Sequence, residues 1–412
     1  MTTSTDSLDV GAIRAHFPIL DRTVHGKPLV YLDNAATTQR PQAVIDAVRF
    51  FYEQTNANVH RGVHQLSVEA SEAFEQSRVA LAHYLNASSD REIVFTRGTT
   101  EAINLVANSF LGSTIQAGDE ILITHMEHHA NIVPWQLLCQ RTGAVLKVVP
   151  IDERGQLDLN TLEELLTDRT RLLGVVHVSN ALGTINPVAR ICDLAHTRGV
   201  PTLIDGAQAT PHLAIDVQAM GCDFYCLSGH KMYGPTGIGA LWAKAEHLEA
   251  MPPWQGGGEM IRHVSFTETS FNDIPHKFEA GSPNVAGPIG LKAAIDFIQS
   301  VGLNAIAAHE CDLLSYATEQ MAEISGLKII GEAEEKGPVI SFVVDGAHAN
   351  DIGTIVDHFG VALRTGHHCA MPAMQFFGVP ATARVSFAMY NQRDEVDTFV
   401  QALNHAIGML RS

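Results

Sequence analysis

The strongest constraint on the fold is an alternation of short apolar runs and amphipathic segments that begins near residue 92. The apolar runs predict buried strands, and the segments between them repeat their apolar residues at helical spacing. We expect strands at residues 92–95, 120–124, 144–150, 172–178 and 202–205, and helices at residues 128–140, 159–166 and 188–196. This alternation predicts βαβ units around a mainly parallel sheet with right-handed crossovers.

The pattern changes in the last third of the chain. Residues 252–282 are rich in glycine, polar and aromatic residues without a clear period, which predicts a loop. From residue 289 onward, two long amphipathic helices precede several short apolar runs and a last helix at residues 394–409. This arrangement predicts a smaller α+β domain with its own core, so we place the domain boundary near residue 290.

Charge and cysteine content exclude several classes of partner and site. A net charge of −18 argues against nucleic acid and anionic membrane as main partners. The first ten residues lack the apolar stretch of a secretory signal, and no apolar run reaches the length of a transmembrane helix. Six scattered cysteines without a CxxC pair predict neither a disulfide framework nor a structural zinc site. We therefore expect a cytoplasmic protein.

Lys231 stands in a turn between two segments, 221–228 and 238–242, that are both expected to be buried strands. Burying an unpaired ammonium is costly and lowers the lysine pKa. The amine then becomes nucleophilic, as a Schiff-base lysine requires. By itself, Lys231 is equally compatible with an ammonium that reaches water at a strand end.

Asp205 ends the apolar run 202–205, and ligands bind at the carboxyl ends of the strands in open α/β sheets. A carboxylate and a Schiff-base lysine on nearby strands suit pyridoxal phosphate. The carboxylate keeps the pyridine nitrogen protonated, and the lysine holds the aldehyde. The alternative role of Asp205 is to cap a helix or turn.

Residues 96–101 (TRGTTE) join an expected strand to an expected helix and carry adjacent hydroxyl side chains. Free N–H groups at a helix start attract an anion, and Thr99 or Thr100 would add a hydroxyl. The segment therefore predicts a phosphate-binding turn. An ordinary helix cap with Glu101 in the first turn explains the same residues equally well.

Two further stretches place histidine or cysteine in expected loops. Residues 124–131 (THMEHHAN) follow a strand, where an imidazole could stack on a flat cofactor. Residues 364–372 (RTGHHCAMP) hold Cys369 in a glycine- and histidine-flanked loop that favours a thiolate. Metal ligation is disfavoured, because adjacent histidines rarely close one tetrahedral shell. Taken alone, Cys369 is more simply interpreted as an inert buried thiol. The alternative role of Arg384 is a structural ion pair.

Together these segments resemble the class V aminotransferase family of fold type I pyridoxal phosphate enzymes, and most closely the group II cysteine desulfurases of the SufS/CsdA type. The resemblance extends from residues 31–38 (YLDNAATT) to residues 384–387 (RVSF). It is most specific in the combination of residues 228–231 (SGHK) with residues 364–372.

The resemblance implies an α/β architecture in three parts. A large domain at residues 25–290 would hold a mainly parallel seven-stranded sheet between helices. A small α+β domain at residues 291–412 would carry the cysteine loop. An N-terminal segment, residues 1–24, would pack with the small domain.

The resemblance also assigns roles to individual residues. Lys231 would bind the cofactor and move the substrate's α-proton, and Cys369 would be the sulfur nucleophile. The cofactor contacts would be Asp205 at the pyridine nitrogen, Gln208 at the phenolic oxygen, His128 stacked on the ring, and Thr99, Thr100, Ser228 and His230 around the phosphate. The substrate contacts would be Asn180 and Arg384 at the carboxylate, with Arg364, His60 and Arg61 nearby. Ser282, where many relatives have threonine, would reach the phosphate of the partner subunit's cofactor.

The implied reaction converts L-cysteine to L-alanine. The Cys369 thiolate would attack the substrate sulfur and hold it as a persulfide for transfer to an acceptor. The short spacing from Arg364 to Pro372 resembles group II enzymes. We therefore expect a homodimer, a SufE-like acceptor protein that feeds an iron–sulfur scaffold, and some selenocysteine lyase activity.

Two alternatives remain open for the function. Another class V enzyme, such as an aminotransferase or a kynureninase-like hydrolase, would share Asp205 and Lys231 without needing Cys369. A non-catalytic assembly platform would need none of the three, so their joint presence argues against it.

Overall fold

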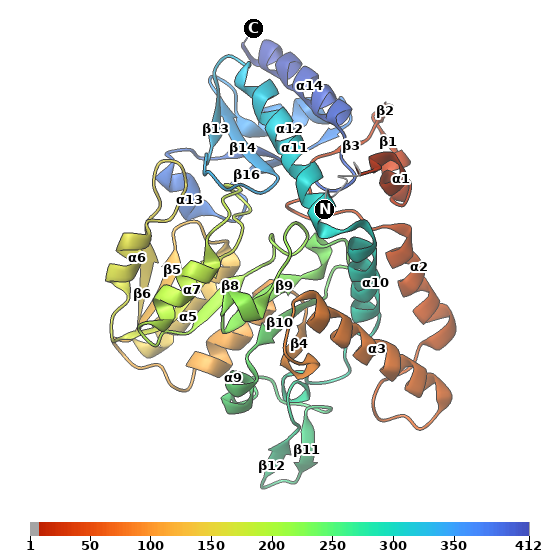
Figure 1. Ribbon diagram of the computed structural model, residues 1–412, viewed down its shortest axis with the longest axis vertical. Coiled ribbons are helices and arrows are strands. Elements are labelled where there is room, and N and C mark those ends of the chain that lie inside the picture. Colours follow the sequence, from red (N-terminus) through yellow and green to blue (C-terminus); the bar gives the residue numbers. More distant parts are fainter. Residues whose placement is uncertain (1–7, 412) are drawn as a thin grey trace, which may run out of the picture.

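The computed structural model describes residues 8–411 and contains a seven-stranded sheet with the strand order β4-β10-β9-β8-β7-β5-β6 (Figure 1). Its strands are β4 Ile93–Thr96, β5 Glu120–Thr124, β6 Val145–Val149, β7 Thr170–Val176, β8 Thr202–Asp205, β9 Phe224–Ser228 and β10 Gly239–Ala243. Only β10 runs antiparallel to its neighbours, β4 and β9, and the other pairs are parallel. The mainly parallel seven-stranded sheet expected from the sequence is therefore confirmed.

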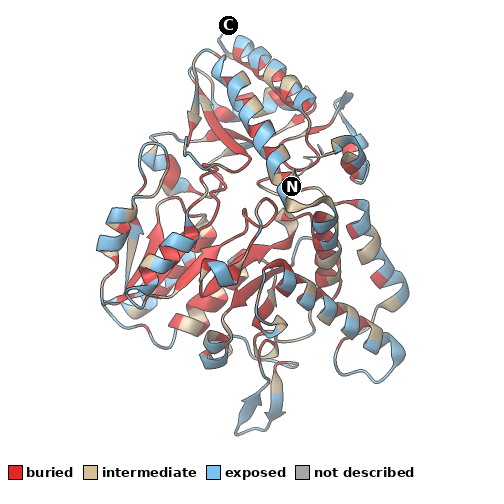
Figure 2. Ribbon diagram, viewed as in Figure 1, coloured by how far each residue is buried: buried red, intermediate tan, exposed pale blue. Residues whose placement is uncertain are grey.

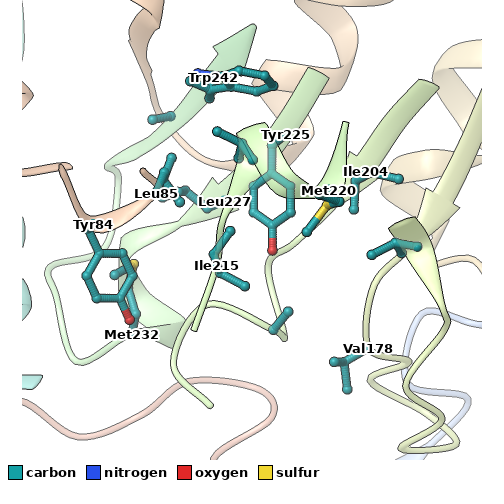
Figure 3. Packing of buried hydrophobic residues seen from close by; sticks show 14 of the residues in the cluster. Tyr84, Leu85, Val178, Ile204, Ile215, Met220, Tyr225, Leu227, Met232 and Trp242 are labelled. Atoms are coloured by element: carbon teal, nitrogen blue, oxygen red, sulfur yellow. The ribbon is translucent and has the colours of Figure 1, made fainter. Parts of the chain in front are cut away.

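The central strands of this sheet are buried on both faces, which explains their continuous apolar runs (Figure 2). The side chains of successive residues point to opposite faces of the sheet and pack in different hydrophobic cores, because side chains alternate along a strand. In β8, Leu203 belongs to one apolar cluster and Ile204 to the other. Figure 3 shows the cluster that contains Ile204, in which Ile204, Tyr225 and Leu227 lie near one another.

Helices cover both faces of the sheet and continue into the C-terminal part of the chain (Figure 1). They are α1 Val10–Arg14, α2 Gln42–Phe50, α3 Gln65–Tyr84, α4 Thr99–Leu105, α5 Val133–Thr142, α6 Leu159–Leu165, α7 Val188–His196, α8 Val217–Met220, α9 Ala245–Ala250, α10 Ala286–Val301, α11 Leu303–Ala322, α12 Ala349–Asp357, α13 Met371–Phe376 and α14 Arg393–Arg411. The helix expected at residues 128–140 is split into a 3-10 turn, His129–Asn131, and α5, which has Pro134 in its first turn.

A second, antiparallel sheet with the order β13-β14-β17-β16 forms the C-terminal unit. Its strands are β13 Leu327–Ile330, β14 Val339–Val344, β16 Arg364–Gly366 and β17 Thr382–Ser386. Residues of α11, α12 and α14 pack on this sheet in a core separate from those of the large sheet. The expected α+β character of this part is observed.

The boundary that we expected near residue 290 falls inside α10. Leu291, Ile295 and Ile298 of this helix belong to a core of the large sheet. The chain then bends by 77° between α10 and α11. We therefore propose that the division between the two units lies closer to Gly302 than to residue 290.

The N-terminal part of the described chain contacts both units. Phe17 packs against Tyr233 of the large unit and Tyr390 of the C-terminal unit. Strand β3, Val30–Tyr31, pairs in parallel with β15, Val361–Ala362, so these residues lie with the C-terminal unit although we had assigned them to the large domain. Residues 1–7 of the expected N-terminal segment lie outside the described residues.

The segment at residues 252–282, expected to be a loop, contains a β-hairpin. Strand β11, Ile261–Val264, pairs with β12, Thr269–Phe271, and the hairpin extends away from the body of the molecule (Figure 1). Most of its side chains are exposed on both faces, so the strands show no alternation of apolar and polar residues. The expectation of a loop was wrong for these two strands for this reason, whereas most of the rest of residues 252–282 is irregular.

Within residues 8–411, no single helix has the length and apolar character needed to cross a membrane. The pair α10 and α11 meets that test only when taken together, across its bend.

Candidate active site

A pocket of about 420 Å³ opens at the carboxyl ends of β8 and β9, between the large sheet and the C-terminal unit. Most of the residues assigned to the site from the sequence line it. They are Thr99, Thr100, His128, Asn180, Asp205, Ser228, His230, Lys231, Arg364, Cys369 and Arg384. The pocket therefore joins residues from distant parts of the chain at the sheet edge where α/β proteins bind ligands.

Lys231 ends a short 3-10 turn, Gly229–Lys231, that directly follows β9. Gly229 N–H donates to the Ile238 carbonyl over 2.9 Å, which fixes the turn against the start of the next strand. Burial lowers the pKa of Lys231, and the carboxylate of Asp205 opposes this shift. A lysine with a lowered pKa is a better nucleophile and proton acceptor at neutral pH.

Asp205 is the last residue of β8 and is 4% exposed. Its Oδ1 accepts a hydrogen bond from Ala207 N–H over 3.0 Å. Burial raises the pKa of Asp205, while Lys231 lowers it. A buried carboxylate with one backbone partner can accept a further charged hydrogen bond from a ligand.

The phosphate-binding turn predicted at residues 96–101 is joined to the lysine segment by hydroxyl groups. Thr99 N–H donates to Ser228 Oγ over 2.9 Å, and the Thr99 and Ser228 hydroxyls are also 2.9 Å apart. Gly98 has a φ of 152°, and a Cβ on Gly239 would come within 2.6 Å of Gly98 Cα. The close approach of the two glycines thus lets the turn lie directly on β10.

His128 and His230 are neutral at physiological pH. Burial, and secondarily the charge of Lys231, lowers the pKa of His128 to about 3 and that of His230 to about 4. His128 Nδ1 accepts from Ala130 N–H over 3.0 Å, which fixes the imidazole at the mouth of the 3-10 turn. A neutral ring held in this way is suited to stack on an aromatic ligand.

The cysteine loop, residues 367–371, follows β16 and enters the pocket from the C-terminal unit. His368 and Cys369 have φ values of 52° and 56°, the left-handed region that non-glycine residues seldom adopt. His129 holds the loop from the other side of the pocket. Its N–H donates to the Cys369 carbonyl over 2.7 Å, and its Nε2 accepts from Met371 N–H over 3.1 Å.

Arg384 and Asn180 lie together, as expected of a carboxylate site. Arg384 is 2% exposed and donates from Nη1 to the Asn180 carbonyl over 2.9 Å. Burial lowers the pKa of Arg384 to about 10. Asn180 Nδ2 donates to the His368 carbonyl over 2.7 Å, which links this pair to the cysteine loop.

Sequence reasoning assigned no role to Asp33, which the structure places beside both arginines. Its Oδ1 is 3.2 Å from Arg384 Nη2, and its Oδ2 is 3.7 Å from Arg364 Nη1. Asp33 opens the DNAATT segment that follows β3, and this polar run after a strand was the available signal. Its carboxylate neutralises part of the positive charge that faces the pocket.

Four residues assigned from the sequence do not line this pocket within the chain. Gln208 is buried, whereas Ser282 is exposed and lines a separate pocket of about 420 Å³. His60 and Arg61 contact Glu259, with His60 Nδ1 at 3.3 Å and Arg61 Nε at 3.1 Å from its carboxylate oxygens. The assignments of these four residues stay predictions, and only that of Ser282 involves a second subunit.

The described polar atoms around the pocket leave several hydrogen-bonding positions open. Asn180 Oδ1, Gln208 Oε1 and Arg384 Nε are buried and have no partner among the described residues. Buried polar groups are normally paired, so open positions clustered around one pocket indicate a polar ligand. The open donor, Arg384 Nε, fits an amino acid carboxylate, and the two open amide oxygens are acceptors for N–H or O–H groups.

Comparisons with known proteins agree with this geometry. Residues 30–399 match the family model "Aminotransferase class-V". A "Probable cysteine desulfurase" of Xylella fastidiosa is 53% identical over 397 residues, covering 96% of this chain and 95% of that protein. A "Cysteine desulfurase" of an Enterobacter species is 53% identical over 406 residues, covering 98% of this chain and 100% of that protein.

Solved structures give the same result for the fold. The cysteine desulfurase CsdA from Escherichia coli, in an S-sulfonic acid form, superposes with a TM-score of 0.92 at 40% identity, over 98% of this chain and 100% of that chain. The apo structure of a cysteine desulfurase from Thermococcus onnurineus superposes with a TM-score of 0.93 at 36% identity, over 99% of this chain and 100% of that chain.

Proposed function

The chain belongs to the class V aminotransferase family, and we propose that it is a pyridoxal phosphate-dependent cysteine desulfurase with the fold type I architecture. The observation that carries this function is the convergence of Lys231 and Cys369 on one pocket from the two units of the chain. An amine at the cofactor and a thiol within reach of the same substrate are the two groups that desulfuration requires.

The pocket residues fit pyridoxal phosphate at both ends of the ring. Lys231 would hold the aldehyde, Asp205 would pair with the pyridine nitrogen, and His128 would stack on the ring. Thr99, Thr100, Ser228 and His230 would surround the phosphate, and Gln208 would contact the phenolic oxygen. When bound, the cofactor supplies an electron sink for bonds broken at the substrate's α- and β-carbons.

Substrate cysteine would be oriented by its carboxylate. Arg384 is buried and has an unpaired Nε, and Asn180 lies beside it, with its carbonyl accepting from Arg384 Nη1. A guanidinium in such a site binds a carboxylate with two parallel hydrogen bonds. Arg364 is more exposed and would close the outer side of the same site.

Lys231 and Cys369 would then carry out different steps of the reaction. The Lys231 amine would take the α-proton, because burial keeps a fraction of it unprotonated. The Cys369 thiolate would attack the substrate sulfur, and the carbon–sulfur electron pair would stay with the carbon and be protonated. The products would be L-alanine and a persulfide on Cys369.

A sulfur acceptor must reach Cys369 for turnover. The cysteine lies in a half-buried loop at the pocket mouth, which suits transfer of the persulfide sulfur to a thiol of another protein. We propose a SufE-like acceptor that supplies an iron–sulfur scaffold in the cytoplasm. Selenocysteine would be a second substrate, because selenium leaves carbon more readily than sulfur.

We propose a homodimer because several assigned residues lie outside their own pocket. Phe50, Tyr52 and Val63 are 59%, 62% and 101% exposed on the same part of the chain as His60 and Arg61. Large exposed apolar side chains of this kind mark protein contacts. In the dimer, Ser282 would reach the partner subunit's phosphate.

The test is alanine and sulfide production from L-cysteine with a reductant, in wild type and Cys369→Ala. We expect equal amounts of both products from the wild type and a loss of both by about a thousandfold in the variant, with cofactor absorbance retained. Cys311→Ser, which removes an exposed thiol on α11, is the matched control. Bound cofactor without any alanine from the wild type would point instead to an aminotransferase or a kynureninase-like hydrolase.

A further inference from the structure

A buried histidine–glutamate pair lies behind Gln208. His212 Nδ1 is 2.7 Å from Glu310 Oε2, and His212 Nε2 is 3.5 Å from Gln208 Nε2. Gln208, His212 and Glu310 are 3%, 4% and 1% exposed. We propose that His212 and Glu310 are positioning residues that orient the Gln208 amide toward the cofactor. This inference rests on the cofactor contact of Gln208 in the proposed function.

The orientation of the Gln208 amide decides whether it can donate to a phenolic oxygen. As placed, its Nε2 faces His212 Nε2, and its Oε1 has no partner among the described residues. Turning the amide by 180° exchanges the two atoms, which are nearly indistinguishable in shape. Oε1 then accepts from His212, and the Nε2 amide group becomes free to donate to the cofactor.

The turned orientation requires a proton on His212 Nε2, and the His212–Glu310 pair supplies it when the pair holds two protons. If His212 is an imidazolium, both ring nitrogens carry protons and Nδ1 pairs with the Glu310 carboxylate. If Glu310 holds the shared proton, it donates to Nδ1 and the neutral imidazole carries its proton on Nε2. Both distributions present the same donor to Gln208, whereas a neutral His212 with its single proton on Nδ1 would present an acceptor, so the proposal requires the pair to hold two protons. Removing the carboxyl group would leave the tautomer of His212 unspecified.

Two buried tyrosines and a cavity belong to the surroundings of the pair. Burial raises the pKa of Tyr84 and of Tyr233, and the carboxylate of Glu310 adds to both shifts. A cavity of about 150 Å³ adjoins the pair and is also lined by Cys311 and Lys336. The other carboxylate oxygen of Glu310, Oε1, has no partner among the described residues, so the cavity offers room for a water at that position.

The pair also connects the two units of the chain. Glu310 lies on α11, whose later residues pack in the core of the C-terminal unit, whereas His212 and Gln208 follow β8 of the large sheet. The proposed contact is therefore a route by which α11 acts on the cofactor through Gln208.

The experiment follows the absorbance of the bound cofactor against pH in the holoenzyme of wild type and Glu310→Gln. A donor at the phenolic oxygen favours its anionic form, so losing that donor should raise the titration midpoint by about one pH unit, a tenfold change in the protonation equilibrium. Glu310→Asp keeps a carboxylate and should restore part of the shift. Cys311→Ser lies on the same helix and the same cavity and should leave the midpoint unchanged.

A double substitution distinguishes positioning from a structural effect. In a Gln208→Ala background, Glu310→Gln should add no further shift, because the proposed effect passes through the Gln208 amide. An equal shift in both backgrounds, or an unchanged midpoint in a folded Glu310→Gln holoenzyme, would overturn the proposal. If Glu310→Gln does not fold, His212→Asn gives the same comparison with the same expected direction. Absence of cofactor absorbance in the wild type would instead refute the proposed function.

Discussion

The lysine segment and the cysteine loop meet in one pocket but are built differently. Lys231 follows a fully buried strand, and its turn is tied to the next strand by backbone hydrogen bonds. Cys369 lies in a half-buried loop with two successive left-handed residues, His368 and Cys369. Proton transfer needs one fixed geometry, whereas a persulfide must first face the substrate and then an acceptor.

The conformation of the cysteine loop is maintained from outside. A non-glycine residue in the left-handed region costs about 1–3 kcal/mol, so the loop persists because other contacts hold it. His129 provides two of these hydrogen bonds and Asn180 a third, all from the large unit. The difference between the two regions is that the lysine segment is fixed by the strands around it, whereas the cysteine loop is held by a few individual hydrogen bonds.

The largest effect should come from Lys231→Ala, which changes the fixed region. We expect desulfuration to fall by at least about a thousandfold and the absorbance of covalently bound cofactor to disappear. The unfolding temperature of the cofactor-free protein should change little, because the turn is held by its backbone. Lys244→Ala, which removes a lysine paired with Asp223 at the end of β10, is the control. Retention of the covalent absorbance in Lys231→Ala would contradict the assignment.

A smaller effect is expected from His129→Ala, which removes one of the hydrogen bonds that hold the cysteine loop. The variant loses the imidazole that accepts from Met371 N–H, so the cysteine loop should open more often. We expect alkylation of Cys369 to accelerate about fivefold to tenfold, the change that the loss of one hydrogen bond of about 1 kcal/mol produces. His125→Ala removes a nearby imidazole that packs on Phe376 instead. Equal alkylation rates in both variants would show that His129 does not restrain the loop.

The smallest effect concerns the pH dependence of the free energy of unfolding, to which His368 contributes. Burial lowers the pKa of His368 to about 3, whereas an exposed histidine has a pKa of about 6.5. Below pH 6.5 the unfolded chain therefore binds a proton that the folded chain does not, and stability falls as the pH falls. Between pH 7 and pH 5 this group should lower the free energy of unfolding by about 2 kcal/mol.

His368→Asn should remove that part of the pH dependence. The measurement is denaturant unfolding of the cofactor-free protein at pH 7 and at pH 5, with His83→Asn, at an exposed position of α3, as the matched control. If His368→Asn loses as much stability on acidification as the wild type, then His368 is not the neutral buried group that its surroundings indicate.

Much of the fixed region could be predicted from the sequence, because continuous apolar runs identify buried strands and polar residues at their ends identify the ligand edge. Lys231 and Asp205 were found in this way. The pairing of Asp33 with Arg384 was not, because it joins residues 351 positions apart through the packing of two units. The hairpin β11–β12 has no apolar alternation. The proposed role of Ser282 involves a second copy of the chain, which the pattern of one sequence does not place.

The pairing of β3 with β15 has a consequence for how the protein can be divided. Val30 and Leu32 contribute to the core of the C-terminal unit, although nearly 300 residues of the large unit separate them from it in sequence. A polypeptide of residues 291–412 alone would lack this strand and expose the edge of β15 to intermolecular pairing. The unit that carries Cys369 is therefore not expected to fold as an independent domain. It can be inherited, exchanged or engineered only together with the N-terminal segment that completes it.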